Sequence, residues 1–273
     1  KMIETPNSFQ EACIVIAQII ATVASNQYGG QSVDLIHLGK YLRKSYDKYK
    51  KEIEEKYKGK VSAEIIEDIV QSRLKTELRA GVQTIQYQIN TLMTTNGQAP
   101  FVTLFLHIEP EDEYAKENAM IIEEVLKQRY EGIKNSEGIY ITPAFPKLVY
   151  VLDECNSLKG GEYDYLTKLA VKCSARRMYP DYISAKKMRE NYEGNVFSPM
   201  GCRSFLSPWK DENDNYEYCI ESLGDLVELV REYRKDNNKL ERKIELPKYK
   251  LSEELINSIS HGVGAALSIV AFI

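Results

Sequence analysis

Near its start the chain has apolar residues that recur from Ile14 onward at spacings of three and four positions, which predicts a helix over residues 9–25. Further isoleucines and valines widen this apolar stripe, so we expect the helix to be largely buried. Ser8 precedes the pattern and Glu11 follows Ser8 by three residues, which is the arrangement of a capping box.

The next region, residues 38–80, mixes charged residues with tyrosines, leucines and isoleucines, as in amphipathic helices. A second helix of this region is expected to begin at Ser62, to bury one apolar face, and to continue past Gly81 to Leu92. The run of charges is interpreted as a solvated helix face rather than a binding patch.

Two short apolar runs, residues 101–106 and 147–153, predict buried strands. Helical patterns over residues 115–129 and 164–173 follow them. Strands that alternate with helices are typical of the α/β class, in which the sheet is parallel.

The composition of the 273 residues, 43% hydrophobic and 28% charged, is that of a globular protein rather than a disordered one. The formal net charge of −4 argues against a nucleic-acid partner, because a duplex binder needs a basic face. A nucleotide ligand remains compatible with this charge.

Five cysteines without a Cys-x-x-Cys pair predict neither a zinc ribbon nor a thioredoxin-like motif, and their odd number favours the cytoplasm over an oxidising compartment. Cys13 and Cys173 lie among apolar neighbours and are expected in the core. Cys155 follows two acidic residues, which disfavour a thiolate. His37 and His107 lack carboxylate or cysteine partners at ligand spacing, so both are interpreted as structural, and no metal site is predicted.

Cys202 is the cysteine with the clearest chemical context. It lies in the stretch Ser-Pro-Met-Gly-Cys-Arg-Ser-Phe-Leu-Ser, residues 198–207. Gly201 tolerates a positive φ and Pro199 fixes its own φ, so the backbone can form a tight, exposed loop. By residue type alone, an unpaired cysteine is more often a buried small hydrophobe.

The surrounding sequence reverses that preference. The loop, together with Arg-Arg-Met-Tyr-Pro-Asp-Tyr-Ile-Ser-Ala-Lys at residues 176–186, resembles the anaerobic (class III) ribonucleoside-triphosphate reductases. The resemblance covers about residues 2–216. Further blocks occur in the same order at residues 3–6, 24–31, 87–92 and 95–105.

This resemblance implies a partial ten-stranded α/β barrel of the glycyl radical enzyme and ribonucleotide reductase type. In that fold Cys202 would sit at the tip of a finger loop and carry the thiyl radical that abstracts the 3′-hydrogen of the ribose. The implied reaction converts ribonucleoside triphosphates to 2′-deoxyribonucleoside triphosphates with formate as reductant.

The resemblance also implies a homodimer and a separate radical activase that uses S-adenosylmethionine. The family's glycyl radical loop, second active-site cysteine and four-cysteine zinc site match no part of this sequence. The chain alone is therefore expected to be inactive.

For the substrate, the loop at residues 96–100 combines donor and acceptor side chains with tight backbone geometry, although a simple turn would have the same residues. The finger loop adds further candidates. The assigned substrate-binding residues are Asn96, Gly97, Gln98, Ser198, Gly201 and Arg203.

Five cations in or near the finger loop are candidates to hold a phosphate, with surface solvation as the alternative for each. They are Arg176, Arg177, Lys186, Lys187 and Arg203.

The family binds a deoxynucleotide or ATP effector at its dimer interface, and the matching positions here are Glu4, Gln18 and Lys48, with Asn7 where some relatives carry lysine. Glu4 and Gln18 can bind polar base edges, and Lys48 can bind a phosphate. As an alternative, Gln18 could bridge backbone groups within its helix.

The family pattern stops beyond Tyr216. We expect a helical effector-binding and dimerisation region over residues 1–95, the partial barrel over 96–216, and a linker helix over 217–243. Residues 244–273 resemble the opening of hemolysin III family membrane proteins, and the apolar run after Val263 is too short to span a bilayer. This tail is interpreted as a truncated or misassembled membrane segment, and a membrane partner is expected only if it is genuine.

Overall fold

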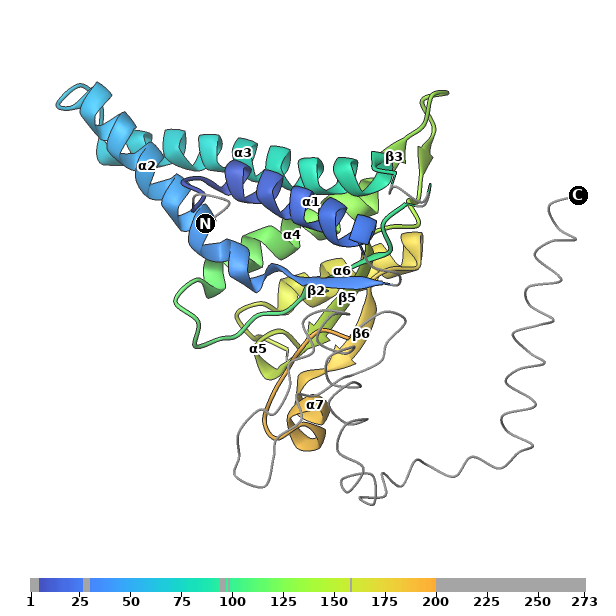
Figure 1. Ribbon diagram of the computed structural model, residues 1–273. Coiled ribbons are helices and arrows are strands. Elements are labelled where there is room, and N and C mark those ends of the chain that lie inside the picture. Colours follow the sequence, from blue (N-terminus) through green and yellow to red (C-terminus); the bar gives the residue numbers. More distant parts are fainter. Residues whose placement is uncertain (1–4, 27–29, 94–96, 98, 158, 200–273) are drawn as a thin grey trace, which may run out of the picture. The chain divides into compact units, whose positions relative to one another are not determined.

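The computed structural model describes residues 5–26, 30–93, 97, 99–157 and 159–199. All of them lie in the first of the two compact units into which the chain divides, Lys1–Ser207. Within this unit long helices pack beside a parallel sheet, and a small hairpin projects next to the end of the longest helix (Figure 1).

Helices and strands alternate along most of the described chain, as the apolar pattern predicts. In order, the elements are α1 (Phe9–Asn26), β1 (Gln31–Asp34), the 3₁₀ helix η1 (Leu35–Leu38), α2 (Gly39–Tyr57), α3 (Ala63–Thr91), β2 (Val102–Leu106), α4 (Ala115–Glu131), β3 (Ile133–Lys134), β4 (Tyr140–Ile141), β5 (Lys147–Leu152), α5 (Glu154–Ser157), α6 (Asp164–Arg177), β6 (Asp181–Ser184) and α7 (Ala185–Asn191).

The main sheet has four parallel strands in the order β1-β2-β5-β6, and β3 pairs with β4 in a separate antiparallel hairpin. Helices α2 and α3 connect β1 to β2, α4 follows β2, and α6 connects β5 to β6. Such helical crossovers are what parallel neighbours require. The α/β class predicted from the sequence is therefore confirmed, whereas the ten-stranded barrel stays a prediction.

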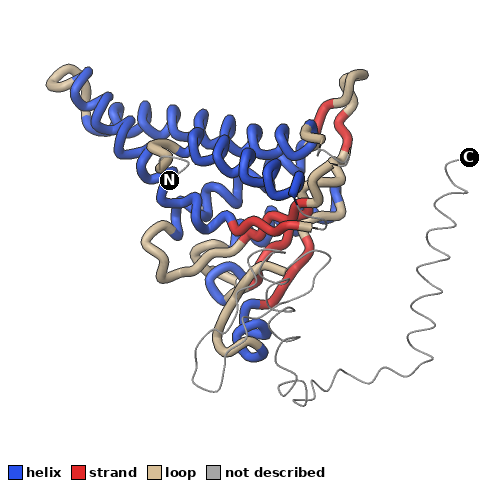
Figure 2. The backbone as a smooth tube through the Cα atoms, in the orientation of Figure 1, coloured by secondary structure: helices blue, strands red, loops and turns tan. Residues whose placement is uncertain are grey.

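One face of the sheet forms the main core with the helices. Leu104 and Tyr150 alternate onto this face and are at most 1% exposed. They share a cluster with apolar residues of α4 and α6, and the Tyr150 hydroxyl lies 3.0 Å from Thr167 Oγ1 on α6. Figure 2 shows the strands gathered beside the helices.

The start of α1 is held by its own cap and by two other helices. Ser8 Oγ accepts a hydrogen bond from the Glu11 N–H, and the Glu11 carboxylate accepts from the N–H of Asn7 rather than from that of Ser8. Ser45 on α2 accepts from the N–H of Phe9, and Glu77 on α3 accepts from the N–H of Gln10. The predicted capping box is thus present with a one-residue extension of its second contact.

The prediction that the first helix is largely buried is wrong for one side of α1. Phe9 and Ile20 are at most 1% exposed, but Ile14 is 42% and Ile19 50% exposed. The helix packs along one side only, so the wide apolar stripe exceeds the area that its neighbours cover.

Helix α1 is also long and apolar enough to cross a membrane, a test based on length and composition that core helices pass too. It is the one such helix among the described residues. Its contacts with α3 and α2 bury part of its apolar surface against protein. The expected membrane segment at residues 244–273 lies outside the described residues.

Candidate functional site

The second face of the sheet carries a different set of side chains. Strand register places Ser32 beside Thr103 and Phe105 beside Val149, so these four side chains share one face by alternation. A small apolar cluster covers part of it, formed by Phe105, Val149, Val151 and Ala185 with Ile183 and Val196.

The segment that leads into the predicted finger loop crosses this second face. Val196 packs into the apolar cluster, and Tyr192 and Phe197 form an edge-to-face pair with centroids 5.1 Å apart. Ser32 Oγ donates a hydrogen bond to the carbonyl oxygen of Pro199, which is buried. The chain is therefore fixed to β1 three residues before Cys202.

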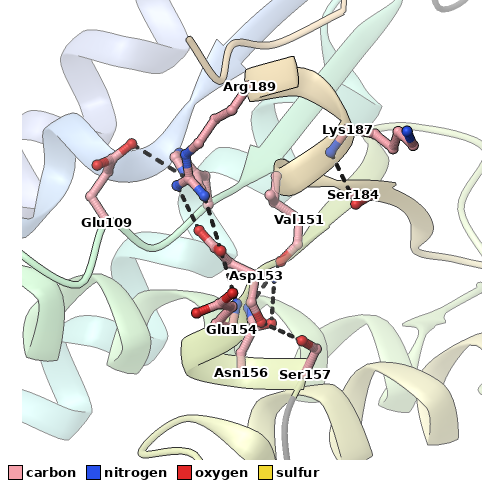
Figure 3. A network of polar contacts seen from close by, with 10 residues as sticks. Glu109, Val151, Asp153, Glu154, Asn156, Ser157, Ser184, Lys187 and Arg189 are labelled. Atoms are coloured by element: carbon pink, nitrogen blue, oxygen red, sulfur yellow. Dashed lines mark hydrogen bonds and ion pairs between the residues drawn. The ribbon is translucent and has the colours of Figure 1, made fainter. Parts of the chain in front are cut away.

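Polar residues gather where the parallel strands end. His107 and Glu109 follow β2, and Asp153 follows β5. Arg189 of α7 donates two hydrogen bonds to Asp153, at 3.0 and 2.6 Å, and Figure 3 shows the guanidinium above that carboxylate. The carboxyl ends of parallel strands are where open α/β folds bind their ligands.

The turn after β5 holds Asp153 in place. Asn156, 2% exposed, accepts a hydrogen bond from the Asp153 N–H and donates one to the carbonyl of Val151. Ser157 donates to the Asp153 carbonyl at 2.5 Å (Figure 3). These contacts satisfy the backbone at the strand end, so the carboxylate is positioned by local sequence.

Burial shifts the pKa values of the histidine and acidic side chains at the strand ends. It lowers the pKa of His107, which favours a neutral imidazole, and raises the pKa of Asp34 at the end of β1. Burial also opposes ionisation of Asp153, but hydrogen bonds from Arg189 and from the Glu154 N–H outweigh it and lower the pKa of Asp153.

Several predicted site residues lie outside the described residues. These are Glu4, Asn96, Gln98, Gly201, Cys202 and Arg203. Of the predicted substrate residues that are described, Gly97 has φ +74° and is exposed, as a tight turn requires, and Ser198 is half-buried on the segment that crosses the sheet.

The described effector candidates line different parts of the helical layer. Lys48 borders a cavity of about 600 Å³ between α1, α2 and α3. Gln18 borders a smaller one, about 220 Å³, between α1 and α3, where its side chain is exposed. Asn7 is exposed at the start of α1. The structure therefore does not bring Gln18 and Lys48 to one cavity within this chain.

Residues that the sequence did not indicate complete the larger cavity. Arg73 and Tyr49 lie at its wall with the guanidinium 5.5 Å from the ring centroid. Gln10 Oε1 and Glu77 Oε2 are buried there without a hydrogen-bond partner among the described residues. Their positions depend on the packing of three helices, for which a single sequence gives no signal.

Arg177 is not a phosphate candidate in this structure. It is 8% exposed and donates to the carbonyls of Tyr130 and Glu131 at the end of α4. Arg176 stays exposed and lies over the ring of Tyr130, and Lys187 pairs with Glu190. The buried guanidinium serves to join α6 to α4.

Burial also determines how reactive the described cysteines are. Cys13 and Cys173 are fully buried, as predicted, and burial with a smaller contribution from Asp153 raises the pKa of Cys155 to about 11. In the part of the chain that the structure describes, no group of three or more His, Cys, Asp or Glu could hold a metal ion.

Comparison with known proteins shows to which family this chain belongs. A model of the anaerobic ribonucleoside-triphosphate reductase family matches residues 1–246. The chain belongs to this family. The match includes both the segment that crosses the second sheet face and Cys202, and it extends past Tyr216.

Known reductases support the assignment in sequence. The anaerobic ribonucleoside-triphosphate reductase of Enterobacteria phage T4 is 39% identical over 218 residues, which are 78% of this chain and 34% of that protein. The Escherichia coli reductase is 37% identical over 214 residues, 77% of this chain and 28% of that protein. The chain thus spans about a third of the length of these curated relatives.

Among solved structures, the anaerobic ribonucleotide reductase from Thermotoga maritima, in complex with dATP and CTP, aligns with a TM-score of 0.42 and 10% identity. The alignment covers 67% of this chain and 29% of that one.

Proposed function

We propose that this chain is part of a catalytic subunit that reduces ribonucleoside triphosphates to 2′-deoxyribonucleoside triphosphates. One observation carries the proposal beyond family membership. The segment before the Met-Gly-Cys-Arg-Ser stretch crosses the second face of the parallel sheet, where Pro199 accepts a hydrogen bond from Ser32. The segment starts at the carboxyl ends of the strands, where α7 lies, and reaches Ser32 near the start of β1, so it carries the chain across the apolar cluster just before Cys202.

In the proposed reaction Cys202 acts as a thiyl radical. It takes the hydrogen atom from C3′ of the ribose and becomes a thiol, and the sugar radical then loses its 2′-hydroxyl, which takes up a proton and leaves as water. Formate is oxidised to carbon dioxide and supplies the two electrons and the hydrogen that C2′ gains. The Cys202 thiol finally returns its hydrogen atom to C3′ and becomes a thiyl radical again. A glycyl radical would provide the oxidising power that first removes the hydrogen atom from the Cys202 thiol.

The apolar cluster beside the crossing segment would protect such a radical. Phe105, Val149 and Val151 are at most 3% exposed and pack with Val196. A dry surface prevents side reactions with water and strengthens the few polar contacts that orient a substrate. The chain would therefore supply both the radical residue and its enclosure.

The remaining parts of the reaction are proposals taken from the family resemblance. They comprise a glycyl radical installed by an activase, formate as reductant, a zinc site in the full-length protein, a homodimer and a cytoplasmic location. Because the matched segment is about a third of each relative's length, this chain on its own is expected to bind nucleotides without turnover.

The cavity around Lys48 is the proposed effector site. Lys48 offers positive charge for a phosphate, and Tyr49 offers an aromatic ring. Arg73 could add a second cation by exchanging its partner Glu52, which lies 3.4 Å away. The side chains of Gln10 and Glu77 add acceptor oxygens to the lining of the same cavity. A deoxynucleotide fits this combination of cations and acceptors, and Lys48→Ala together with Arg73→Ala should weaken its binding to this chain.

The test of the catalytic proposal is Cys202→Ala in the full-length protein, assayed with its activase and formate. Turnover should disappear, whereas nucleotide binding and the glycyl radical signal should persist. Cys155→Ala is the control, since its thiol is half-buried and has a raised pKa. Retained turnover in Cys202→Ala would remove the role given to this residue.

Two alternative functions predict different experimental results. A non-catalytic nucleotide-binding remnant would bind deoxynucleotides but show no turnover even in its full-length form. A hemolysin III-like membrane protein would sediment with membranes through the segment at residues 244–273. The family match favours neither alternative.

A further inference from the structure

His107 is a buried imidazole with an unused hydrogen-bonding atom. The side chain is 3% exposed, and Nε2 has no hydrogen-bond partner among the described residues. Glu109 Oε1 lies 3.6 Å from Nε2, beyond hydrogen-bond distance. Buried polar atoms are paired in the large majority of cases, so this nitrogen points to a further partner.

The groups around this imidazole favour a neutral partner with hydroxyl groups. Asp34, Glu109 and Asp153 are acidic, and Arg189 is already engaged by Asp153. A phosphate would be repelled by this surplus of negative charge. Burial keeps the imidazole neutral by lowering the pKa of His107, so Nε2 can pair with a hydroxyl without a charge being buried.

Glu109 places a second acceptor beside this nitrogen. Its side chain is 47% exposed, whereas that of Asp153 is 8% exposed and held by Arg189. Because Glu109 Oε1 lies 3.6 Å from Nε2, one hydroxyl group could contact both atoms. Carboxylates at this edge of α/β sheets commonly bind the hydroxyls of a ribose.

The imidazole lies on the same face of the sheet as the segment that leads to the finger loop. Its ring centroid is 5.9 Å from that of Phe105, a residue of the second face. Ser32, which holds Pro199, is opposite Thr103 on this same face.

We propose that His107 and Glu109 bind a hydroxyl group of the ribose of the substrate, a role that neither the family match nor the sequence pattern assigns to them. The proposal rests on the proposed function, because it takes a ribonucleotide as the ligand. His107 and Glu109 would then favour ribonucleotides over nucleotides without ribose hydroxyls.

The test uses this chain as it exists and reads the imidazoles directly by NMR. The sequence has three histidines, so His107→Gln and His37→Gln assign the signals. A ribonucleoside triphosphate should shift the Nε2 resonance of His107, and the matching 2′,3′-dideoxynucleotide should shift it much less. Glu109→Gln should weaken binding of the ribonucleotide several-fold, whereas the exposed Glu111→Gln should not.

The possible outcomes distinguish a failure of the ribose contact from a failure of the proposed function. If calorimetry detects ribonucleotide binding but the His107 signals do not move, the ribose contact is wrong and the proposed function stands. Equal shifts with both nucleotides would also overturn the ribose contact. If neither nucleotide binds at all, nucleotide binding by this chain fails, and the inference fails with it.

Discussion

The two faces of the parallel sheet are made by the same strands but differ in what they bury. The helix-covered face contains Leu104 and Tyr150 within a large apolar core. The second face combines a small apolar cluster with Ser32, Thr103 and the polar group at the strand ends. Ser32 and Asp153 are hydrogen-bonded, but His107 Nε2 is buried without a partner among the described residues, which costs stability and indicates a role other than folding.

The difference indicates that the helix-covered face mainly stabilises the fold and that the second face mainly serves function. Substitutions on the helix-covered face should mainly change stability, and substitutions on the second face should mainly change nucleotide chemistry.

The largest expected change in stability is on the helix-covered face. Leu104→Ala should lower the free energy of unfolding by about 2–5 kcal/mol, because the residue is 1% exposed and its removal leaves a cavity. Urea denaturation measures the change. Met93→Ala is the control, since Met93 is 77% exposed and should change stability by no more than about 0.5 kcal/mol. Similar losses in both variants would contradict the assignment of the core.

The next largest change in stability is expected for the ion pair between Asp153 and Arg189 at the strand ends. Asp153→Asn should lower the free energy of unfolding by about 1.5–3 kcal/mol near neutral pH, because Arg189 loses a charged acceptor. The folded protein lowers the pKa of Asp153 below the ordinary value of about 3.9, so the contribution is present above that pH and is lost as the pH falls through the folded pKa.

Urea denaturation of wild type and Asp153→Asn over a series of pH values measures this dependence. The gap between the two should narrow in acid. Asp68→Asn, at an exposed position of α3, should show no such gap. A gap that widens in acid would contradict the sign of the shift.

A conservative change in the small cluster should separate stability from activity. Phe105→Leu should cost less than about 1.5 kcal/mol, but it should lower turnover of the full-length protein roughly 10–100-fold, because Val196 loses its packing partner and the finger loop shifts. Leu106→Met, one position along on the helix-covered face, should leave turnover unchanged. Equal turnover in the two variants would contradict the functional difference between the two faces of the sheet.

The smallest effect is expected for the single hydrogen bond between β1 and the crossing segment. Ser32→Ala should cost about 1 kcal/mol and speed the hydrogen exchange of residues 192–198. Ser32→Thr, which keeps a hydroxyl, should restore the slower exchange. Unchanged exchange in Ser32→Ala would mean that another contact holds the segment.

Much of the fold could be predicted because its long elements have periodic sequences. The capping residues fixed the start of α1, and the apolar runs located β2 and β5. Strands β1 and β6 have only four residues each, Gln-Ser-Val-Asp and Asp-Tyr-Ile-Ser, so their apolar signal is too short to recognise. The exposed side of α1 was missed because periodicity does not say how many neighbours a helix has.

The site was less predictable because it depends on strand register. The sequence indicates a structural His107, because no carboxylate or cysteine lies at metal-ligand spacing from it and Asp153 is distant in the chain. Parallel pairing of β2 with β5 brings it near Asp153. Likewise, Gln18 and Lys48 were expected to serve one effector, and only the packing of α1 on α3 shows that they line separate cavities.

The most direct test of the central claim is whether Cys202 faces the second side of the sheet. Ser32→Cys and Val33→Cys place thiols at adjacent positions of β1 that point to opposite faces. A short bifunctional maleimide is added to each variant, and the linked peptides are identified by mass spectrometry. The account predicts a link from position 32 to Cys202 and none from position 33; a link from position 33 alone, or equal links from both, would contradict it.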